Sequence, residues 1–101
     1  MDLNEAREAI DAVDGEMARL FVRRMEAVRE IAAYKLAHGL PTEDRERERL
    51  MEERLCALID DAGLRPYYLR FLENTVELSK SYQRGLMPAA GESGGETAVE
   101  K

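Results

Sequence analysis

Residues 3–37 read LNEAREAIDAVDGEMARLFVRRMEAVREIAAYKLA, and two rows of side chains repeat in them every seven residues. The rows are Leu3, Ile10, Met17, Arg24 and Ile31, and beside them Ala6, Val13, Leu20, Ala27 and Tyr34. A mostly apolar heptad seam of this kind is typical of a helix that packs against other helices. Gly15 lies inside it and costs about 1 kcal/mol relative to alanine, but the seam stays in register across the glycine. We therefore predict one continuous helix.

This helix is too long for one compact chain of 101 residues. Its thirty-five residues would span about 52 Å, whereas a domain of this size has a diameter of roughly 34 Å. The overhanging part of the seam needs cover, and a second copy of the chain is the simplest source of it. We predict an all-α homodimer.

Two shorter helices are predicted after the long one, at residues 43–62 and 66–84. Thr42 is a suitable N-cap for the first of them, and Gly63 is the expected stop. The second begins at a proline, which the first turn of a helix accepts, and Gly85 is expected to close it. The chain should therefore contain one long and two shorter helices.

The composition, 45% apolar and 36% charged, indicates a folded domain with a polar surface. A formal net charge of -6 argues against nucleic acid or a membrane surface as a partner. One cysteine and one histidine exclude a zinc site built from several such ligands. The single cysteine and an N-terminus without an apolar signal core predict a cytoplasmic protein.

Residues 87–101, rich in Gly, Ser and Glu, predict a disordered tail or linker after a domain at 1–86.

Cations interrupt the apolar face of the long helix. Arg24 occupies the seam itself, and Lys35 follows eleven residues later, so both project from nearly the same face about 16 Å apart. Two long cationic side chains at this spacing can bracket a small anion. Arg7 lies about 25 Å from Arg24 along the helix axis, which is too far to share that site, but it could reach the equivalent site of a second copy.

The second helix begins with a run of charges, and helical spacing divides this run into two sides. Asp44, Arg47 and Glu48 are expected to point inward, whereas Glu43, Glu46 and Arg49 are expected to point to solvent. We expect Glu48→Ala to lower the rate of any reaction at this site most.

Ser79 and Gln83 continue the apolar face of the third helix, while Lys80 and Arg84 are expected to face solvent. Taken singly, each inward polar residue has an ordinary structural explanation, such as a favourable interaction with a helix dipole. Together the three helices contribute cations, a carboxylate and neutral hydrogen-bonding groups. This combination predicts a polar pocket for a small ligand that carries carboxylates and a hydroxyl.

Four segments carry a family resemblance: REAIDAVD at 7–14, RRMEAVREIAAYK at 23–35, DRERE at 44–48 and SKSYQ at 79–83. In this order and spacing, the chain resembles the all-helical class of chorismate mutases over residues 3–86. The resemblance implies an intertwined homodimer of three-helix chains with two equivalent active sites. It also implies a cytoplasmic isomerase of the shikimate pathway that converts chorismate to prephenate for phenylalanine and tyrosine biosynthesis. This Claisen rearrangement needs no cofactor and no metal.

The resemblance implies catalytic roles for four side chains. Arg24 would hold a substrate carboxylate, and Glu48 would accept a hydrogen bond from the ring hydroxyl. Lys35 and Gln83 would donate to the ether oxygen, where negative charge develops as the C–O bond breaks. Because Gln83 donates without being protonated, activity should persist at neutral and mildly alkaline pH.

Four further positions complete the implied substrate-binding set. Arg7 of the other chain would hold the substrate carboxylates together with Arg24, and Ser79 would touch a carboxylate as well. Arg47 would support that carboxylate through water, and the backbone at Asp44 would assist Glu48 in binding the ring hydroxyl.

Other functions fit the same sequence features. Relatives of this fold act on isochorismate as pyruvate lyases or on 4-amino-4-deoxychorismate, and a carboxylate such as Glu48 suits an amino group as well as a hydroxyl. A helical dimerisation module without catalysis is a third possibility, but such a module would not need the inward cations.

Overall fold

A computed structural model of the chain describes residues 1–86, which form three α-helices: α1 (Leu3–His38), α2 (Arg45–Cys56) and α3 (Arg65–Leu86). No strand occurs in this part of the chain. The prediction of an all-α fold with one long and two shorter helices is therefore confirmed. The predicted tail at 87–101 lies outside the described residues.

Helix α1 is continuous through Gly15 and ends one residue beyond the predicted boundary. Asp2 caps its N-terminus, because its side chain accepts a hydrogen bond from the Glu5 amide at 2.8 Å while the Glu5 side chain accepts from the Asp2 amide at 2.9 Å. Gly39 ends the helix with φ at 65°, a left-handed conformation that favours glycine. Local sequence signals therefore fix both ends of α1.

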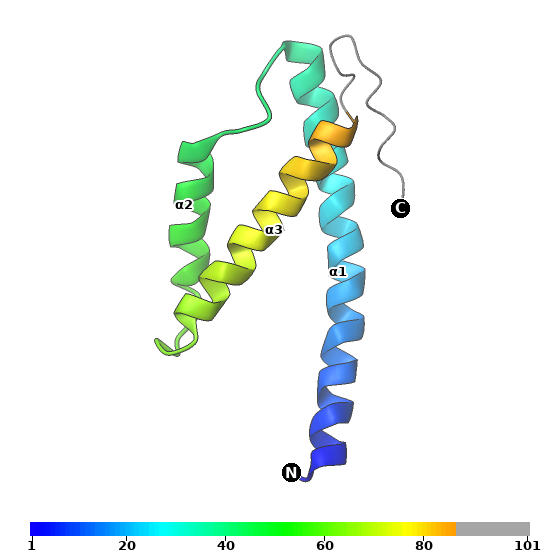
Figure 1. Cartoon of the computed structure of the whole chain (residues 1–101), viewed down its shortest axis with the longest axis vertical. Coiled ribbons are helices and arrows are strands. Elements are labelled where there is room, and N and C mark those ends of the chain that lie inside the picture. The colour runs from blue at the N-terminus through cyan, green and yellow to red at the C-terminus, as the bar shows by residue number, and fades with distance from the viewer. Residues whose placement is uncertain (87–101) are drawn as a thin grey trace.

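Figure 1 shows how the three helices are arranged. The C-terminal half of α3 packs against α1, and its N-terminal half packs against α2. The N-terminal half of α1 extends alone beyond the other helices. The molecule is 56 Å long with a radius of gyration of 17.0 Å, well above the roughly 13 Å of a compact domain of this length. The predicted overhang of α1 is confirmed.

Helix α2 is shorter at both ends than predicted. The expectation that Thr42 caps it is wrong: Asp44 is the N-cap, and its carboxylate accepts a hydrogen bond from the Arg47 amide at 3.1 Å. The expected end near Ala62 is also wrong, because the helix stops at Cys56. Beyond that residue the backbone tightens into turns with bonds three residues apart, such as Leu58 N to Leu55 O at 3.0 Å.

The connection from α2 to α3 is held by side chains. Arg65 donates to the carbonyl of Ile59 at 2.6 Å, and the Asp61 carboxylate accepts from the Gly63 amide at 2.8 Å. These bonds satisfy backbone groups that a longer α2 would have used. Helix α3 then begins one residue before the predicted start and continues two residues past its predicted end, so Gly85 lies inside the helix and does not close it.

The apolar core of one chain is small. Among residues 1–86 only three apolar side chains are buried: Val28, Ala32 and Leu72. Large apolar side chains of the α1 seam are instead exposed, at 60% for Ile10, 50% for Val13 and 54% for Leu20. A single copy therefore leaves much of this seam exposed to water, and burying the seam against another surface would be favourable.

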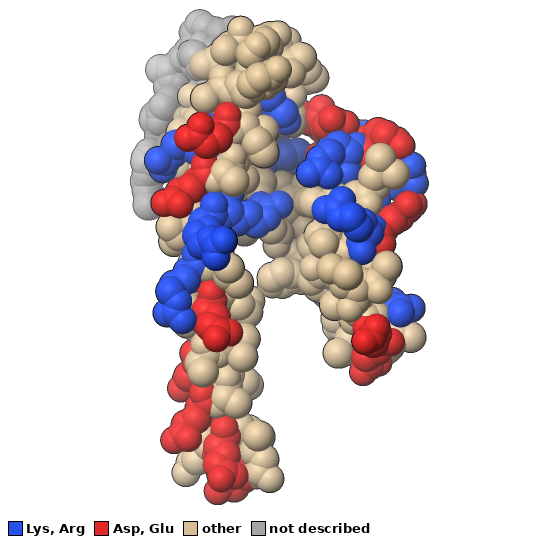
Figure 2. Space-filling view, turned by 180° about the vertical axis from the view of Figure 1, so that it is seen from behind, with Lys and Arg blue, Asp and Glu red and all other residues tan. Residues whose placement is uncertain are grey.

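Charge is distributed unevenly over the surface. In Figure 2, Lys and Arg side chains gather on both sides of the hollow between the long arm and the shorter one, whereas Asp and Glu dominate the free end of the long arm. The hollow is therefore locally basic in a chain whose formal net charge is -6.

None of the helices within residues 1–86 is both long and apolar enough to cross a membrane.

Candidate active site

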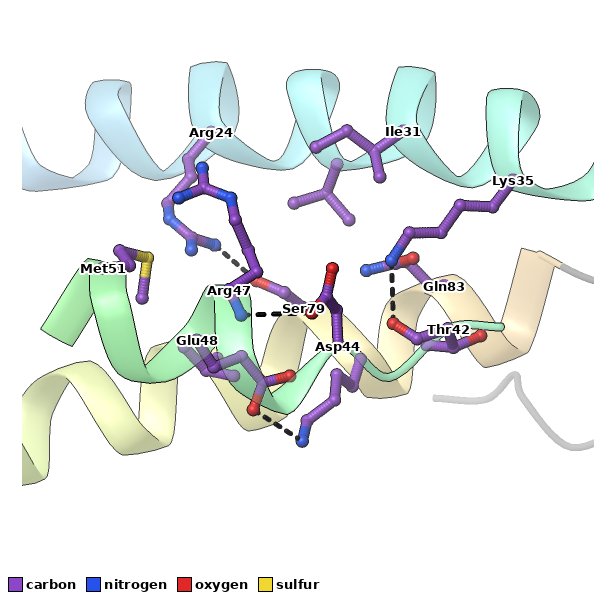
Figure 3. A pocket seen from close by; sticks show the side chains of 13 residues that line it. Arg24, Ile31, Lys35, Thr42, Asp44, Arg47, Glu48, Met51, Ser79 and Gln83 are labelled. Carbon is purple, nitrogen blue, oxygen red and sulfur yellow. Dashed lines mark hydrogen bonds and ion pairs between the residues drawn. The ribbon is translucent and has the colours of Figure 1, made fainter. Parts of the chain in front are cut away.

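A cavity of about 230 Å³ lies where the three helices approach one another. Seven of the eight predicted site residues line it: Arg24, Lys35, Asp44, Arg47, Glu48, Ser79 and Gln83. In Figure 3 these side chains converge from α1, from the start of α2 and from α3. The structure thus brings together residues that lie up to 59 positions apart in the sequence, from Arg24 to Gln83.

The two cations of α1 are each held by a neutral partner. The Arg24 guanidinium donates to the Ser79 hydroxyl on α3, which in turn donates to the Thr75 carbonyl at 2.9 Å. The Lys35 ammonium donates to the backbone carbonyl of Thr42 at 2.8 Å. These bonds restrict both long side chains without neutralising their charge, so both cations remain available to an anion.

The first turn of α2 divides its charges as predicted. Glu46 and Arg49 pair with each other at 2.8 Å on the outer side, with side chains 69% and 54% exposed. The Asp44 carboxylate is engaged as the N-cap, while the Arg47 side chain points into the cavity (Figure 3). Arg47 therefore adds a second guanidinium to the site.

Glu48 supplies the carboxylate of the cavity and has a partner that was not expected. Its Oε1 lies 3.4 Å from the Lys80 ammonium, drawn as a dashed line in Figure 3, and the two side chains are only 23% and 14% exposed. The expectation that Lys80 faces solvent is wrong. Lys80 lies one turn beyond Val76 and one turn before Gln83, and both of these residues also line the cavity, so the inward face of α3 is wider than the single stripe considered.

Gln83 closes the cavity beside Lys35. Its side chain is 6% exposed, and its Oε1 has no hydrogen-bond partner within residues 1–86. A buried polar atom without a partner is costly, by about 1–3 kcal/mol, so its presence calls for an explanation, and a catalytic role is one. Because the terminal amide can present either its oxygen or its NH₂ group, Gln83 can donate to a ligand in the cavity.

The cavity carries more positive than negative charge. Within residues 1–86, Arg24, Lys35 and Arg47 form no ion pair with a carboxylate, whereas Glu48 is paired with Lys80. Three unneutralised cations in a partly enclosed space attract anions more strongly than the same charges on an open surface. The site is therefore suited to a ligand with more than one carboxylate, despite the negative net charge of the chain.

Arg7 does not line this cavity. It lies in the first two turns of α1, on the part of the helix that extends beyond α2 and α3. This position agrees with the expectation that Arg7 cannot share a site with Arg24 of the same chain.

Two arginines outside the cavity have pKa values above the ordinary value for that side chain. Hydrogen bonding to Tyr82 raises the pKa of Arg29, and hydrogen bonding to Glu46 raises the pKa of Arg49. Both guanidinium groups lie outside the cavity and are protonated at any physiological pH. No group of three or more His, Cys, Asp or Glu side chains within residues 1–86 is placed to hold a metal ion.

Comparison with known families agrees with this geometry. The sequence profile of the family described as chorismate mutase type II matches residues 6–84, a range that includes Arg7 and every helix of the fold. The chain belongs to the chorismate mutase type II family. The resemblance inferred from the four sequence segments is thereby confirmed.

Two curated relatives illustrate the match to this family. The chain is 36% identical over 62 residues to the T-protein of Haemophilus influenzae, covering 61% of this chain and 16% of that protein. It is 30% identical over 70 residues to the monofunctional chorismate mutase of Enterobacter agglomerans, covering 68% of this chain and 39% of that protein. The chain therefore spans well under half the length of the curated relatives it matches. No solved structure gives a significant match.

Two residues of the site escaped the sequence analysis. Thr42 contributes through its backbone carbonyl, and no side-chain pattern reports where a loop carbonyl will point. Lys80 lies four residues after Val76 and three before Gln83 on α3, so helical spacing permits an inward direction for it but does not fix one.

Proposed function

We propose that this chain is a chorismate mutase, which converts chorismate to prephenate on the route to phenylalanine and tyrosine. The observation that carries the proposal is the distribution of charge in the cavity. Three cations without an ion pair within residues 1–86 line it from α1 and α2, whereas its two carboxylates lie together at the start of α2. The Asp44 carboxylate is engaged as the N-cap, which leaves Glu48 as the carboxylate that can face a ligand. Chorismate has a matching distribution, with two carboxylates, an ether oxygen and one ring hydroxyl.

The proposed mechanism relies on positioning and electrostatics. Arg24 binds a substrate carboxylate, with Arg47 and Ser79 in support, and this selects the compact conformer in which the two reacting carbons meet. Lys35 and Gln83 donate hydrogen bonds to the ether oxygen. These bonds strengthen as the C–O bond breaks and negative charge develops, so they stabilise the transition state more than the bound substrate.

Glu48 holds the opposite end of the substrate. Its carboxylate accepts a hydrogen bond from the ring hydroxyl, and the backbone at Asp44 assists. No proton has to move and no covalent intermediate has to form, so the reaction needs neither a nucleophile nor a general base. The proposed chemistry therefore uses only side chains of the protein, those of the cavity together with Arg7 of a second copy.

The proposed active form is an intertwined homodimer with two sites. The exposed seam of α1 supports this, because Ile10, Val13 and Leu20 are each at least half exposed in one copy. Crossing of the two long helices would bring Arg7 of the second copy to a substrate carboxylate beside Arg24. The single cysteine of the chain, Cys56, is free, which supports a place in the reducing cytoplasm.

Direct turnover of chorismate tests the proposal. Purified protein should consume chorismate, seen as falling ultraviolet absorbance, and prephenate should appear in equal amount. Consumption of isochorismate or of the 4-amino analogue without prephenate formation would assign a different substrate to the same site. If none of the three compounds reacts, the fold acts without this chemistry and the proposal is wrong.

A matched pair of substitutions in α2 locates the reaction in the cavity. Glu48→Ala should lower kcat/KM for chorismate by about a hundredfold or more, since the ring hydroxyl loses its acceptor. Glu46→Ala removes a carboxylate from the exposed side of the same turn and should change kcat/KM by less than about twofold. Steady-state kinetics on both variants, with folding checked by circular dichroism, gives the comparison. Equal effects of the two substitutions would place the reaction elsewhere.

A further inference from the structure

Lys80 lies in the cavity but has no part in the proposed mechanism. Its side chain is 14% exposed and its ammonium lies 3.4 Å from Glu48 Oε1 and 3.6 Å from Glu43 Oε2. Glu43 is more exposed, at 44%, and also pairs with Arg45 at 2.9 Å. Glu48 has no other cationic partner within residues 1–86, so it depends on Lys80 more than Glu43 does.

The position of Lys80 on α3 suits it to hold Glu48. Ser79 and Gln83, its neighbours on the inward face, both line the cavity and are both buried, so this turn of α3 is well ordered by packing. Glu48 lies on α2, and its ion pair with Lys80 links the two helices at the edge of the site. An ion pair this poorly exposed is screened by water much less than a surface pair.

We propose that Lys80 is a positioning residue that fixes the Glu48 carboxylate toward the substrate; this inference rests on the proposed function. The ammonium engages Oε1, which leaves the other carboxylate oxygen free to accept from the ring hydroxyl. Without Lys80, the Glu48 side chain would lose its ion-pair partner and sample other rotamers. Positioning of a substrate contact is sensitive to displacements of this kind.

The same ion pair has a consequence for substrate choice. An unpaired carboxylate attracts a protonated amine much more strongly than a neutral hydroxyl, and pairing with a lysine weakens this preference. A second cation beside Glu48 would also lie close to the Lys80 ammonium and be repelled by it. Lys80 therefore favours a substrate with a hydroxyl over one with an amine at the same ring position.

Two variants of Lys80 and one control test this role. Lys80→Met should lower kcat/KM for chorismate about tenfold, while Lys80→Arg, which keeps the cation, should stay within about threefold of the wild type. The 4-amino analogue, measured as a competitive inhibitor of chorismate turnover, should bind Lys80→Met more tightly relative to chorismate by about tenfold. Arg84→Met removes a cation one turn further along α3, where Arg84 pairs with Glu77 and both are exposed, and should change none of these values.

A double-mutant cycle separates positioning from a general structural effect. In a Glu48→Gln background, Lys80→Met should change kcat/KM by less than about twofold, because the group that it positions is no longer charged. A tenfold loss in both backgrounds would mean that Lys80 acts independently of Glu48, and would overturn the inference. Lys80→Gln provides a second variant if Lys80→Met does not fold, as judged by circular dichroism.

The outcomes distinguish failure of this inference from failure of the proposed function. Wild-type protein that does not rearrange chorismate would refute the function and the role of Lys80 together. Active wild-type protein with Lys80→Met indistinguishable from Arg84→Met would refute the role of Lys80 alone.

Discussion

Gln83 places a neutral donor in a cationic cavity. It is buried beside Lys35 (Figure 3), and its amide oxygen has no hydrogen-bond partner within residues 1–86. An amide does not titrate in the physiological range, so its hydrogen bond to the ether oxygen is available at any pH at which the protein folds. We expect wild-type activity to vary little between about pH 6 and pH 8.

Substitution of this amide by a carboxyl group should create a pH dependence. A glutamic acid side chain has a pKa of about 4.3 in water, and burial raises it. Gln83→Glu can donate to the ether oxygen only while protonated. Above its pKa the carboxylate would repel the negative charge developing there, so kcat/KM should fall as the pH rises. A pH profile of kcat/KM for both proteins is the measurement, and an unchanged profile in Gln83→Glu would remove Gln83 from the proposed mechanism.

The sequence is informative about single residues where a charge interrupts an apolar pattern. Arg24 and Glu48 could be assigned to the site because charged side chains rarely occupy an inward stripe without a reason. Lys80 lies on the border of the inward stripe of α3, and a lysine in such a position can turn toward the site or toward solvent. Its direction is decided by Glu48 on another helix, a tertiary contact that no local pattern contains.

Helix α1 has one glycine within it and another at its C-terminal end, and the two have opposite roles. Gly15 lies within the helix, and a methyl group there would meet only the end of the Arg19 side chain, at 4.0 Å. Gly39 has φ at 65° with nothing near its added Cβ, so backbone conformation alone limits substitution there. The two positions therefore allow helix propensity and backbone strain to be measured separately in one element.

We expect Gly15→Ala to stabilise the protein by about 0.5–1 kcal/mol, since alanine loses less backbone freedom on folding. Gly39→Ala should instead destabilise it by about 1–2 kcal/mol, the cost of a left-handed conformation for a residue with a Cβ. Urea unfolding at one fixed protein concentration gives both values. A loss of stability in Gly15→Ala would indicate that a second copy packs closely against this glycine.

Helix boundaries were predictable where the signals are local. Both ends of α1 follow from Asp2, Glu5 and Gly39, which act within one turn of each terminus. The start of α2 is harder to predict, because Thr42 and Asp44 lie two residues apart and both are residue types that favour the N-cap position. The carbonyl of Thr42 is instead engaged by Lys35 from α1, so a contact between elements decided which cap is used.

At the scale of the whole molecule, the chain has an excess of apolar surface over what it buries. The long reach of α1, 56 Å along the longest axis of the molecule, was predictable from helix length alone. The small number of buried side chains was not predictable, because it depends on which part of α1 is covered by α2 and α3. Arg7 and the exposed seam lie on the same overhanging half of α1, so one event, pairing with a second copy, would bury the seam and complete the proposed site.

Subunit mixing tests this proposal directly. Arg7→Ala and Lys35→Ala dimers should each be nearly inactive, since each of their sites lacks one cation. A mixed dimer would place both substitutions in one site and leave the other intact. Random exchange of equal amounts should therefore restore about a quarter of wild-type activity. Arg24→Ala mixed with Lys35→Ala is the matched control and should restore none, because both residues line the same cavity of one chain. Recovery in neither mixture would mean that each site is built from a single chain, and that Arg7 acts elsewhere.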